Sequence, residues 1–193
     1  MATTTGSDRR TGAETRAEIL RVALELFTEK GFEGTSTRDI SSELGITKSS
    51  LYYHFQNKDA IVTGLMEQRR HELDDLVEWI SAQPRTPDLL RNAALRWVES
   101  STPERLEVMR FAQANQPVMK RLKGSGKDIR SAFDVVIDLL VDDDATEQDR
   151  LYARMVFDTI SAAMIAARGT AATPADVLAA ARRATIALTG TGA

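Results

Sequence analysis

A short segment after Gly45 carries side chains suited to binding nucleic acid rather than to catalysing a reaction. Helical spacing over residues 48–55 turns Leu51 inward and four other side chains outward, namely Lys48, Ser49, Tyr52 and Tyr53. Lysine and serine reach phosphates or base edges, and tyrosine contacts a phosphate or a thymine methyl group. No acidic residue occurs over residues 44–58, so this segment is a candidate for contact with DNA. A capped helical hairpin without a role in DNA binding would show the same pattern.

The residues before this segment predict a second short helix, over 37–44, whose start suits a phosphate. Ser36 is a candidate N-cap, and Asp39 is its reciprocal partner. Free amides and hydroxyls at a helix N-terminus bind anions, and this one presents Thr35, Ser36, Thr37 and Arg38. Lys58, which follows the segment, is a further candidate phosphate anchor.

Neither histidine has the neighbours that catalysis requires. His54 and His71 lack a nucleophile or an orienting carboxylate nearby in the sequence. Glu67 and His71 could share a helix face, but a metal ion needs more ligands than this pair. We therefore expect no catalytic residue, no metal site, no cofactor and no enzymatic activity.

A glycine-containing stretch over residues 123–127 lacks the first glycine and the final serine or threonine of a phosphate loop, so we expect a flexible turn. Basic residues gather around it. These residues are Lys120, Arg121, Lys123, Lys127 and Arg130. They could attract an anionic ligand or form a solvated helix face, and we favour the solvated face.

Helices must position all these residues, because helical spacing recurs along the chain and no segment alternates as a strand does. The sequence predicts an all-α fold of about nine helices. Asp144, with Glu147 as its partner, is the expected cap of the eighth helix. The expected helices cover residues 11–30, 37–44, 48–55, 57–81, 87–101, 103–113, 128–141, 144–168 and 174–188.

The composition is that of an ordinary soluble globular protein. Hydrophobic residues make up 42% of the 193 residues and charged residues 27%, and there is no cysteine. No stretch is long and apolar enough to span a bilayer, so we expect a cytoplasmic protein without a membrane partner. Because the net charge is −3, the case for DNA binding depends on where the charges lie.

The N-terminal third closely resembles the TetR family of transcriptional regulators, over about residues 13–65. From Met66 onward only the length and the helicity match. The matching residues are Ile19-Leu20 with Ala23, Leu26 and Phe27, then Gly31-Phe32, Thr35-Ser-Thr-Arg-Asp-Ile40, Leu44-Gly-Ile-Thr-Lys-Ser-Ser-Leu-Tyr-Tyr-His-Phe55, Asn57-Lys58 and Ile61.

The resemblance implies a helix-turn-helix DNA-binding domain over residues 11–60. Residues 1–10 before it are polar and rich in threonine, so we expect a disordered arm there. A long fourth helix would join the DNA-binding domain to an effector-binding and dimerisation domain over residues 61–193. Ser49 stands where many relatives have glycine, so a base preference does not transfer. The implied DNA-binding residues, with Thr47 as N-cap, are Thr37, Arg38, Thr47, Lys48, Ser49, Ser50, Tyr52, Tyr53, His54 and Lys58.

Two further sets of residues follow for the C-terminal domain. We expect most of the large apolar side chains of this domain to be core, and a subset could line a pocket between helices, with one amide to orient a ligand. The candidate pocket residues are Trp97, Met109, Phe111, Gln113, Phe133 and Phe157. The last two long helices are rich in small residues, and the resemblance implies that they form a dimer interface. An ordinary intrachain interface would show the same pattern. The interface set is Tyr152, Met155, Ala163, Ala167, Leu178 and Ile186.

Together these features predict a ligand-responsive regulator, and we expect a repressor. Two copies would bind a palindromic or pseudopalindromic operator in double-stranded DNA, and an apolar or amphipathic small-molecule effector would release it. The alternatives are a helical protein-interaction adaptor and a small all-α enzyme with a fortuitous helix-turn-helix. An enzyme would need convergent titratable residues, and the sequence offers none.

Overall fold

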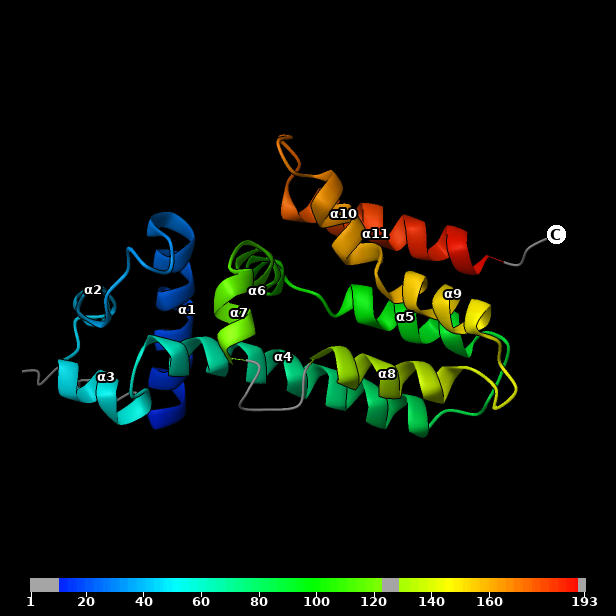
Figure 1. The fold of residues 1–193 in the computed structure, drawn as a ribbon, viewed down its shortest axis with the longest axis horizontal. Coiled ribbons are helices and arrows are strands. Elements are labelled where there is room, and N and C mark those ends of the chain that lie inside the picture. Colours follow the sequence, from blue (N-terminus) through cyan, green and yellow to red (C-terminus); the bar gives the residue numbers. More distant parts are fainter. Residues whose placement is uncertain (1–10, 123–128, 191–193) are drawn as a thin grey trace, which may run out of the picture. The chain divides into compact units, whose positions relative to one another are not determined.

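A computed structural model describes residues 11–122 and 129–190, without the side chains of residues 129–132. The expected N-terminal arm over 1–10 and the expected turn over 123–127 lie outside the described residues. The described chain is all helical (Figure 1). Its helices are α1 (Gly12–Lys30), α2 (Thr37–Glu43), α3 (Lys48–His54), α4 (Lys58–Ser81), α5 (Leu89–Glu99), α6 (Pro103–Ala114), α7 (Gln116–Leu122), α8 (Ile129–Leu140), α9 (Glu147–Phe157), α10 (Thr159–Ala166) and α11 (Pro174–Thr189).

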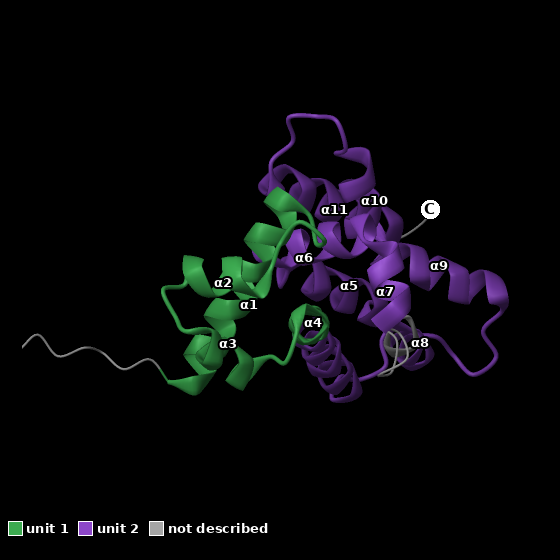
Figure 2. Cartoon of the chain, turned by 60° about the vertical axis from the view of Figure 1, so that its left-hand side comes forward, with its two compact units in different colours: residues 1–66 green, residues 67–193 purple. Residues whose placement is uncertain are grey.

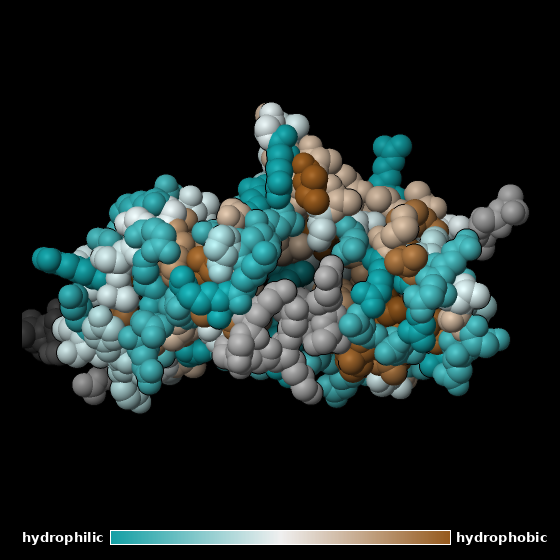
Figure 3. All heavy atoms as spheres, in the orientation of Figure 1, coloured by the Kyte–Doolittle hydropathy of each residue, from teal (hydrophilic) through white to brown (hydrophobic). Residues whose placement is uncertain are grey.

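The chain divides into two compact units, residues 1–66 and residues 67–193 (Figure 2). The division falls within α4, so the first part of this helix belongs to unit 1 and the rest to unit 2. No helix in the described part of the chain is long and apolar enough to cross a membrane. The face drawn in Figure 3 is mainly hydrophilic, with smaller apolar patches.

Helix α1 is the longest helix that lies wholly in unit 1, and local signals define both its ends. Thr11 and Glu14 form a reciprocal capping box at its start, with N···O distances of 2.6 and 3.2 Å. Gly31 follows its last residue with a φ of +77°, a conformation that glycine adopts without strain. Both ends were expected from the sequence.

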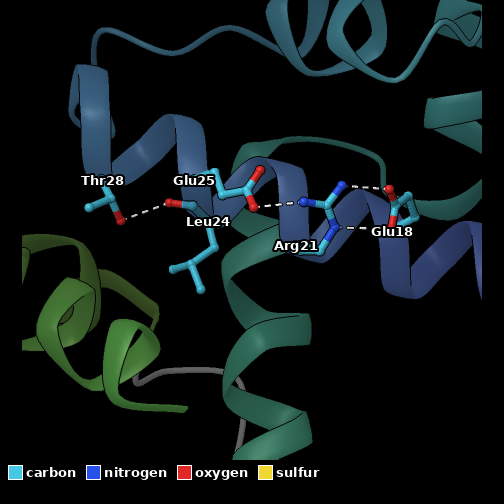
Figure 4. A network of polar contacts seen from close by, with 5 residues as sticks. All are labelled: Glu18, Arg21, Leu24, Glu25 and Thr28. Carbon is cyan, nitrogen blue, oxygen red and sulfur yellow. Dashed lines mark hydrogen bonds and ion pairs between the residues drawn. The ribbon is translucent and has the colours of Figure 1, made fainter. Parts of the chain in front are cut away.

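The two faces of α1 differ as its sequence predicts. The inward face is buried in the core of unit 1. The outward face carries Arg21, whose guanidinium bonds Glu18 one turn before it and Glu25 one turn after it, each at 2.6 Å (Figure 4). Exposed pairs at this spacing each stabilise a helix by about 0.2–0.5 kcal/mol. The same view shows the Thr28 hydroxyl donating to the Leu24 carbonyl at 2.8 Å.

The core of unit 1 is made by all four of its helical segments. The fully buried side chains come from α1, α2, α3 and α4 and are Ile19, Ala23, Ile40, Leu51, Ile61 and Val62. Gly64 on α4 permits close packing there. A Cβ at this position would lie 2.9 Å from Phe55 and 3.1 Å from Leu20. The helix-turn-helix is therefore seated on α1 and α4 by apolar contacts rather than by surface charges.

The core of unit 2 is built from α4, α5, α6, α8, α9, α10 and α11. Helix α11 packs on both α5 and α10, and its Ala181 is fully buried. Helices α8 and α9 are joined by two ion pairs, Asp134 with Arg154 and Asp138 with Arg150. The acidic partner on α8 moves four residues forward, from 134 to 138, while the basic partner on α9 moves four residues back, from 154 to 150. The two helices are therefore antiparallel.

Several helix boundaries differ from those expected. The region around Pro117 forms α7 instead of an irregular connection, since proline is tolerated in a first turn. Helix α5 begins at Leu89 rather than at residue 87. The expected helix over 144–168 starts later, capped by Thr146 and Asp149 instead of Asp144 and Glu147, and breaks at Asp158 into α9 and α10.

A buried polar contact follows the break at Asp158. Thr159 and Thr185 are 4% and 0% exposed, and their hydroxyl oxygens lie 2.9 Å apart. Thr159 also lies 3.4 Å from the Val156 carbonyl oxygen. The pair links the first turn of α10 to α11 and satisfies two hydroxyls that no solvent reaches.

Candidate nucleic-acid interface

The start of α2 is fixed by a capping box, as the sequence predicts. The Ser36 hydroxyl accepts from the Asp39 amide at 3.1 Å, and the Ser36 amide donates to the Asp39 carboxylate at 2.8 Å. The hydrogen bonds from the side chain and backbone of Ser36 lower the pKa of Asp39. The box leaves Arg38 exposed and Thr37 half-buried in the first turn of α2.

The box also narrows which groups could receive a phosphate. Asp39 occupies the Ser36 hydroxyl and amide, so these are not free donors. Thr35 is only 1% exposed, and its hydroxyl lies 3.0 and 2.9 Å from the carbonyl oxygens of Leu26 and Gly31. Its expected place at the surface of this N-terminus was wrong, because the hydroxyl satisfies the end of α1.

Helix α3 presents a polar and aromatic surface on a short, firmly placed segment. Gly45 takes a φ of +63° in the turn, and Thr47 caps the helix by accepting from the Ser50 amide at 3.1 Å. Leu51 is fully buried and points the opposite face outward. On that face Lys48 and Ser49 are exposed, Tyr52 is 46% exposed and Tyr53 is 85% exposed.

A hydrogen bond joins the outward faces of α2 and α3. The Tyr52 and Thr37 hydroxyl oxygens lie 3.3 Å apart. The Tyr53 ring packs edge-on against His54, with ring centres 5.1 Å apart. These contacts hold Tyr52 and Tyr53 on one surface before any partner arrives. Ser50 and His54 are half-buried beside them.

Lys58 is partly engaged by its own chain. Its ammonium nitrogen donates to the Phe32 carbonyl at 2.6 Å and lies 4.5 Å from the centre of the Phe32 ring. An ammonium group has three N–H donors, so two are left for another acceptor. The contact ties the start of α4 to the turn after α1, a structural role that the sequence did not reveal.

The two histidines do not form a site with other ligands. His54 ends α3, and His71 is an exposed residue of α4. Within residues 11–122 and 129–190, no group of three or more histidine, aspartate or glutamate side chains is placed to hold a metal ion.

Comparison with known families identifies this arrangement. Residues 19–65, from α1 to α4, match the profile of "Bacterial regulatory proteins, tetR family". The helix-turn-helix segment of the chain belongs to the TetR family. This matched segment contains the whole helix-turn-helix. It also contains all ten residues expected to contact DNA, nine of them between Thr37 and His54 and the tenth at Lys58.

Curated relatives that are named as transcriptional regulators match part of the chain. HTH-type transcriptional regulator AcrR of Shigella flexneri is 32% identical over 93 residues, 47% of this chain and 43% of that protein. HTH-type transcriptional repressor KstR2 of Rhodococcus jostii is 43% identical over 61 residues, 32% of this chain and 28% of that protein. The chain thus spans less than half the length of these relatives.

Solved structures extend the likeness of fold to the rest of the chain. A transcriptional regulator of Aquifex aeolicus VF5 has a TM-score of 0.68 at 18% identity, covering 88% of this chain and 96% of that chain. SmeT in complex with triclosan has a TM-score of 0.59 at 22% identity, covering 90% of each chain. Identities this low show the fold, which is all helical as the sequence predicts.

Three of the six expected ligand residues lie together in unit 2. The rings of Trp97 and Phe133 meet edge-on with centres 5.4 Å apart, and Phe133 and Phe157 lie 6.2 Å apart. Met109 packs against the same core. Phe111 is buried but is not one of the residues of this core. The side-chain oxygen of Gln113, the amide expected to orient a ligand, accepts a hydrogen bond from Arg168 at 2.9 Å.

Unit 2 also has an open depression of about 440 Å³, which none of the six expected ligand residues lines. Its lining residues are Trp79, Asn92, Leu95, Arg96, Glu99 and Ser100.

The residues expected at a dimer interface differ in exposure. Tyr152 and Met155 on α9 are 40% and 58% exposed. Ala163, Ala167 and Leu178 are half-buried and pack against the core of their own unit. Ile186 is also half-buried. Small residues such as Ala163 and Ala167 therefore pack within their own unit.

One cluster of charged residues in unit 2 was not predicted from the sequence. Arg69 is 8% exposed, although arginine is rarely buried. Its position gave a usable signal. Arg69 occurs between Leu65 and Leu73 in the buried stripe of α4, where helical spacing requires an apolar residue.

Proposed function

We propose that this TetR-family protein is a ligand-responsive transcription regulator that binds operator DNA through α3. The observation that carries the proposal is the exposed surface of Lys48, Ser49, Tyr52 and Tyr53 on a helix seated in the core by Leu51. Donors that are rigidly placed on a major-groove helix lose little entropy on binding and read base edges.

The proposed division of labour within this surface follows from side-chain chemistry. Lys48 and Ser49, at the start of α3, would reach base edges or phosphates. The phosphate backbone would be held by Arg38, by Thr37 and by the two N–H donors of Lys58 that its own chain does not use. The remaining members of the expected set would assist from the cap and the half-buried edge: Thr47, Ser50, Tyr52, Tyr53 and His54.

We further propose that residues 11–60 are the DNA-binding domain and residues 61–193 the effector-binding and dimerisation domain. A homodimer would place two α3 helices about 34 Å apart, on successive major grooves of a palindromic or pseudopalindromic operator. The exposed apolar residues of α9 favour association through unit 2. The partner of this protein would be chromosomal DNA, so the protein would act in the cytoplasm.

Regulation would follow from differential binding of a small molecule. Several curated relatives are named as repressors, including KstR2, and the SmeT structure contains triclosan. An effector bound in unit 2 would release the operator only to the extent that it prefers the non-binding conformation. Helix α4 contributes residues to both units and is the continuous element through which such a preference could act.

The proposal is tested by gel shift with DNA from upstream of the protein's own gene. Lys48→Ala is expected to weaken specific binding about 10-fold or more, because a good side-chain contact to a base is worth about 1–3 kcal/mol. Lys120→Ala, an exposed lysine of α7, is the matched control and should leave the affinity unchanged. Circular dichroism should show the same helicity for all three proteins.

Two results would contradict the proposal. One is unretarded DNA at physiological salt with folded wild-type protein. The other is equal affinity of the wild type and Lys48→Ala, which would remove α3 from the interface even if DNA binds elsewhere.

A further inference from the structure

Unit 2 contains a group of charges around one tryptophan, in which Arg69 is 8% exposed and the side chains of Arg105 and Glu72 are 11% and 26% exposed. Arg69 comes from α4 and Arg105 from α6, and the Trp97 ring comes from α5. The guanidinium carbons of Arg69 and Arg105 lie 5.0 and 5.6 Å from the centre of this ring. Glu72, one turn after Arg69, forms an ion pair of 2.8 Å with Arg105.

The group carries one positive charge more than its own chain neutralises. Glu72 provides a single carboxylate for two arginines. It pairs with Arg105, whose other terminal nitrogen donates to the Ser100 hydroxyl at 3.1 Å. No ion pair to Arg69 is found in the described part of the chain. The positive charge on Arg69 is therefore balanced only at longer range.

Two buried N–H donors of this group have no acceptor among the described residues. They are Nη1 of Arg69 and Nε of Arg105. Oxygen Oε2 of Glu72 is likewise buried without a donor. Leaving a buried polar atom unpaired costs about 1–3 kcal/mol, and more for a charged group. Burial, together with the neighbouring charge of Arg105, lowers the pKa of Arg69 to about 10, and Glu72 raises it only in part.

We propose that Arg69 and Arg105 form a subsite that binds the carboxylate of a small-molecule ligand. A carboxylate supplies the missing negative charge and accepts two N–H bonds, as the free Nη1 and Nε require. The net charge of the subsite falls from +1 to zero when a monoanion binds. This inference rests on the proposed function, since it assigns a chemical class to the effector of unit 2.

The rings beside the subsite indicate an apolar body for the same ligand. Trp97 contacts Phe133, and Phe133 contacts Phe157, so a row of aromatic rings in the core continues from the two guanidinium groups. Met109 packs against the same core and can adapt its shape. A carboxylate attached to an aromatic ring or an alkyl chain fits this sequence of a cationic end followed by apolar surface.

A purely structural role explains the cluster less well. If position 69 only had to fill space, methionine or leucine would fill it without the free-energy cost of burying a charge. Arg96 offers a comparison within the same chain. Its guanidinium stacks on Trp79 at 5.1 Å while the residue stays exposed to water, so that stacking needs no buried charge.

The test measures binding of benzoate and of decanoate to the full chain, at constant ionic strength and without DNA. Trp79→Phe leaves Trp97 as the single tryptophan, so its fluorescence reports on the subsite. Benzamide, which has nearly the shape of benzoate but no charge, is the matched probe. Arg69→Met and the control Arg96→Met are made in the Trp79→Phe background.

We expect at least one of the two carboxylates to change the Trp97 fluorescence saturably. Benzamide should bind about tenfold more weakly than benzoate, or not at all. Arg69→Met should lose about tenfold or more of the carboxylate affinity, whereas Arg96→Met should keep it. Without ligand, Arg69→Met should melt at the same or a higher temperature than its parent, because it removes an uncompensated buried charge.

Several outcomes would overturn the inference. They are the failure of both carboxylates to bind with a Kd below about 10 mM, equal binding of benzoate and benzamide, and unchanged carboxylate affinity in Arg69→Met. If Arg69→Met does not fold, Arg69→Lys keeps the charge, and the comparison of benzoate with benzamide on the parent still decides. A gel shift that fails while benzoate binds would refute the DNA proposal and leave this one standing.

Discussion

Gly64→Ala is expected to destabilise unit 1, although alanine is the better helix former. A Cβ on residue 64 would lie 2.9 Å from Phe55 Cε1, 3.1 Å from Leu20 Cδ2 and 3.3 Å from Arg16 Nη2. Favourable carbon contacts lie at about 3.5–4.0 Å. Phe55 is 3% exposed and is covered by Arg16, whose guanidinium carbon is 4.3 Å from the ring centre, so the ring has no free direction to move.

The magnitude follows from two opposing effects. Replacing glycine by alanine inside a helix stabilises it by about 0.8–1.0 kcal/mol. Overpacking a core typically costs about 1–3 kcal/mol. The contact with the buried Phe55 ring and the tight contact with buried Leu20 correspond to the upper half of that range, about 2–3 kcal/mol. We therefore expect the free energy of unfolding of unit 1 to fall by roughly 1–2 kcal/mol.

Urea unfolding followed by two probes can separate this effect from changes in unit 2. Both tryptophans, Trp79 and Trp97, belong to unit 2, so their fluorescence reports on that unit. Circular dichroism reports on the helices of both. The variant should lower the midpoint seen by circular dichroism more than the midpoint seen by fluorescence.

Gly12→Ala is the matched control. A Cβ there would meet only His54, at an ordinary contact distance of 3.9 Å. This variant should be as stable as the wild type or slightly more stable, because nothing opposes the helix propensity of alanine. If Gly64→Ala unfolds at the same or a higher urea concentration than the wild type, the close approach of α4 to Phe55 and Leu20 is not what the structure indicates.

Two other expectations concern the capping boxes and the buried threonine pair. Hydrogen bonds from Ser36, Thr146 and Thr173 lower the pKa values of Asp39, Asp149 and Asp176 in the folded chain. The stability that these carboxylates provide is therefore complete above their unfolded pKa of about 3.9 and is lost as the pH falls through the lower folded values, so urea midpoints should drop below about pH 4. Asp176→Asn should flatten that acid limb, and an unchanged limb would count against the box. Thr185→Val should cost about 1–3 kcal/mol because it leaves the Thr159 hydroxyl poorly paired, and adding Thr159→Val should cost less than the sum of the two single variants; strictly additive losses would mean that the two hydroxyls do not interact.

The helix-turn-helix was predictable because its signals lie within a few residues of one another. A serine followed three residues later by an aspartate defines the start of α2, and Thr47 defines the start of α3. Gly31 and Gly45 have positive φ angles where the sequence places helix ends. The outward residues of α3 then follow from helical spacing, since Leu51 alone fixes which side faces the core.

What could not be predicted depends on residues far apart in the sequence. The break between α9 and α10 has no proline or glycine to announce it, and the threonine pair beside it joins residues 159 and 185. The partner of Lys58 is the Phe32 carbonyl, 26 residues away. The charge on Arg69 has meaning only once Trp97 and Arg105 have been brought to it by two other helices.

The exposure of the two α3 tyrosines has a thermodynamic consequence. The free chain keeps much of the Tyr52 ring and most of the Tyr53 ring in water. Any duplex that covers these rings dehydrates aromatic surface, which makes the heat-capacity change of association more negative. The enthalpy of complex formation would then become steadily more favourable on warming. Calorimetric titrations at several temperatures would detect the burial of the two rings as this temperature dependence, even if the rings form no hydrogen bond with the DNA.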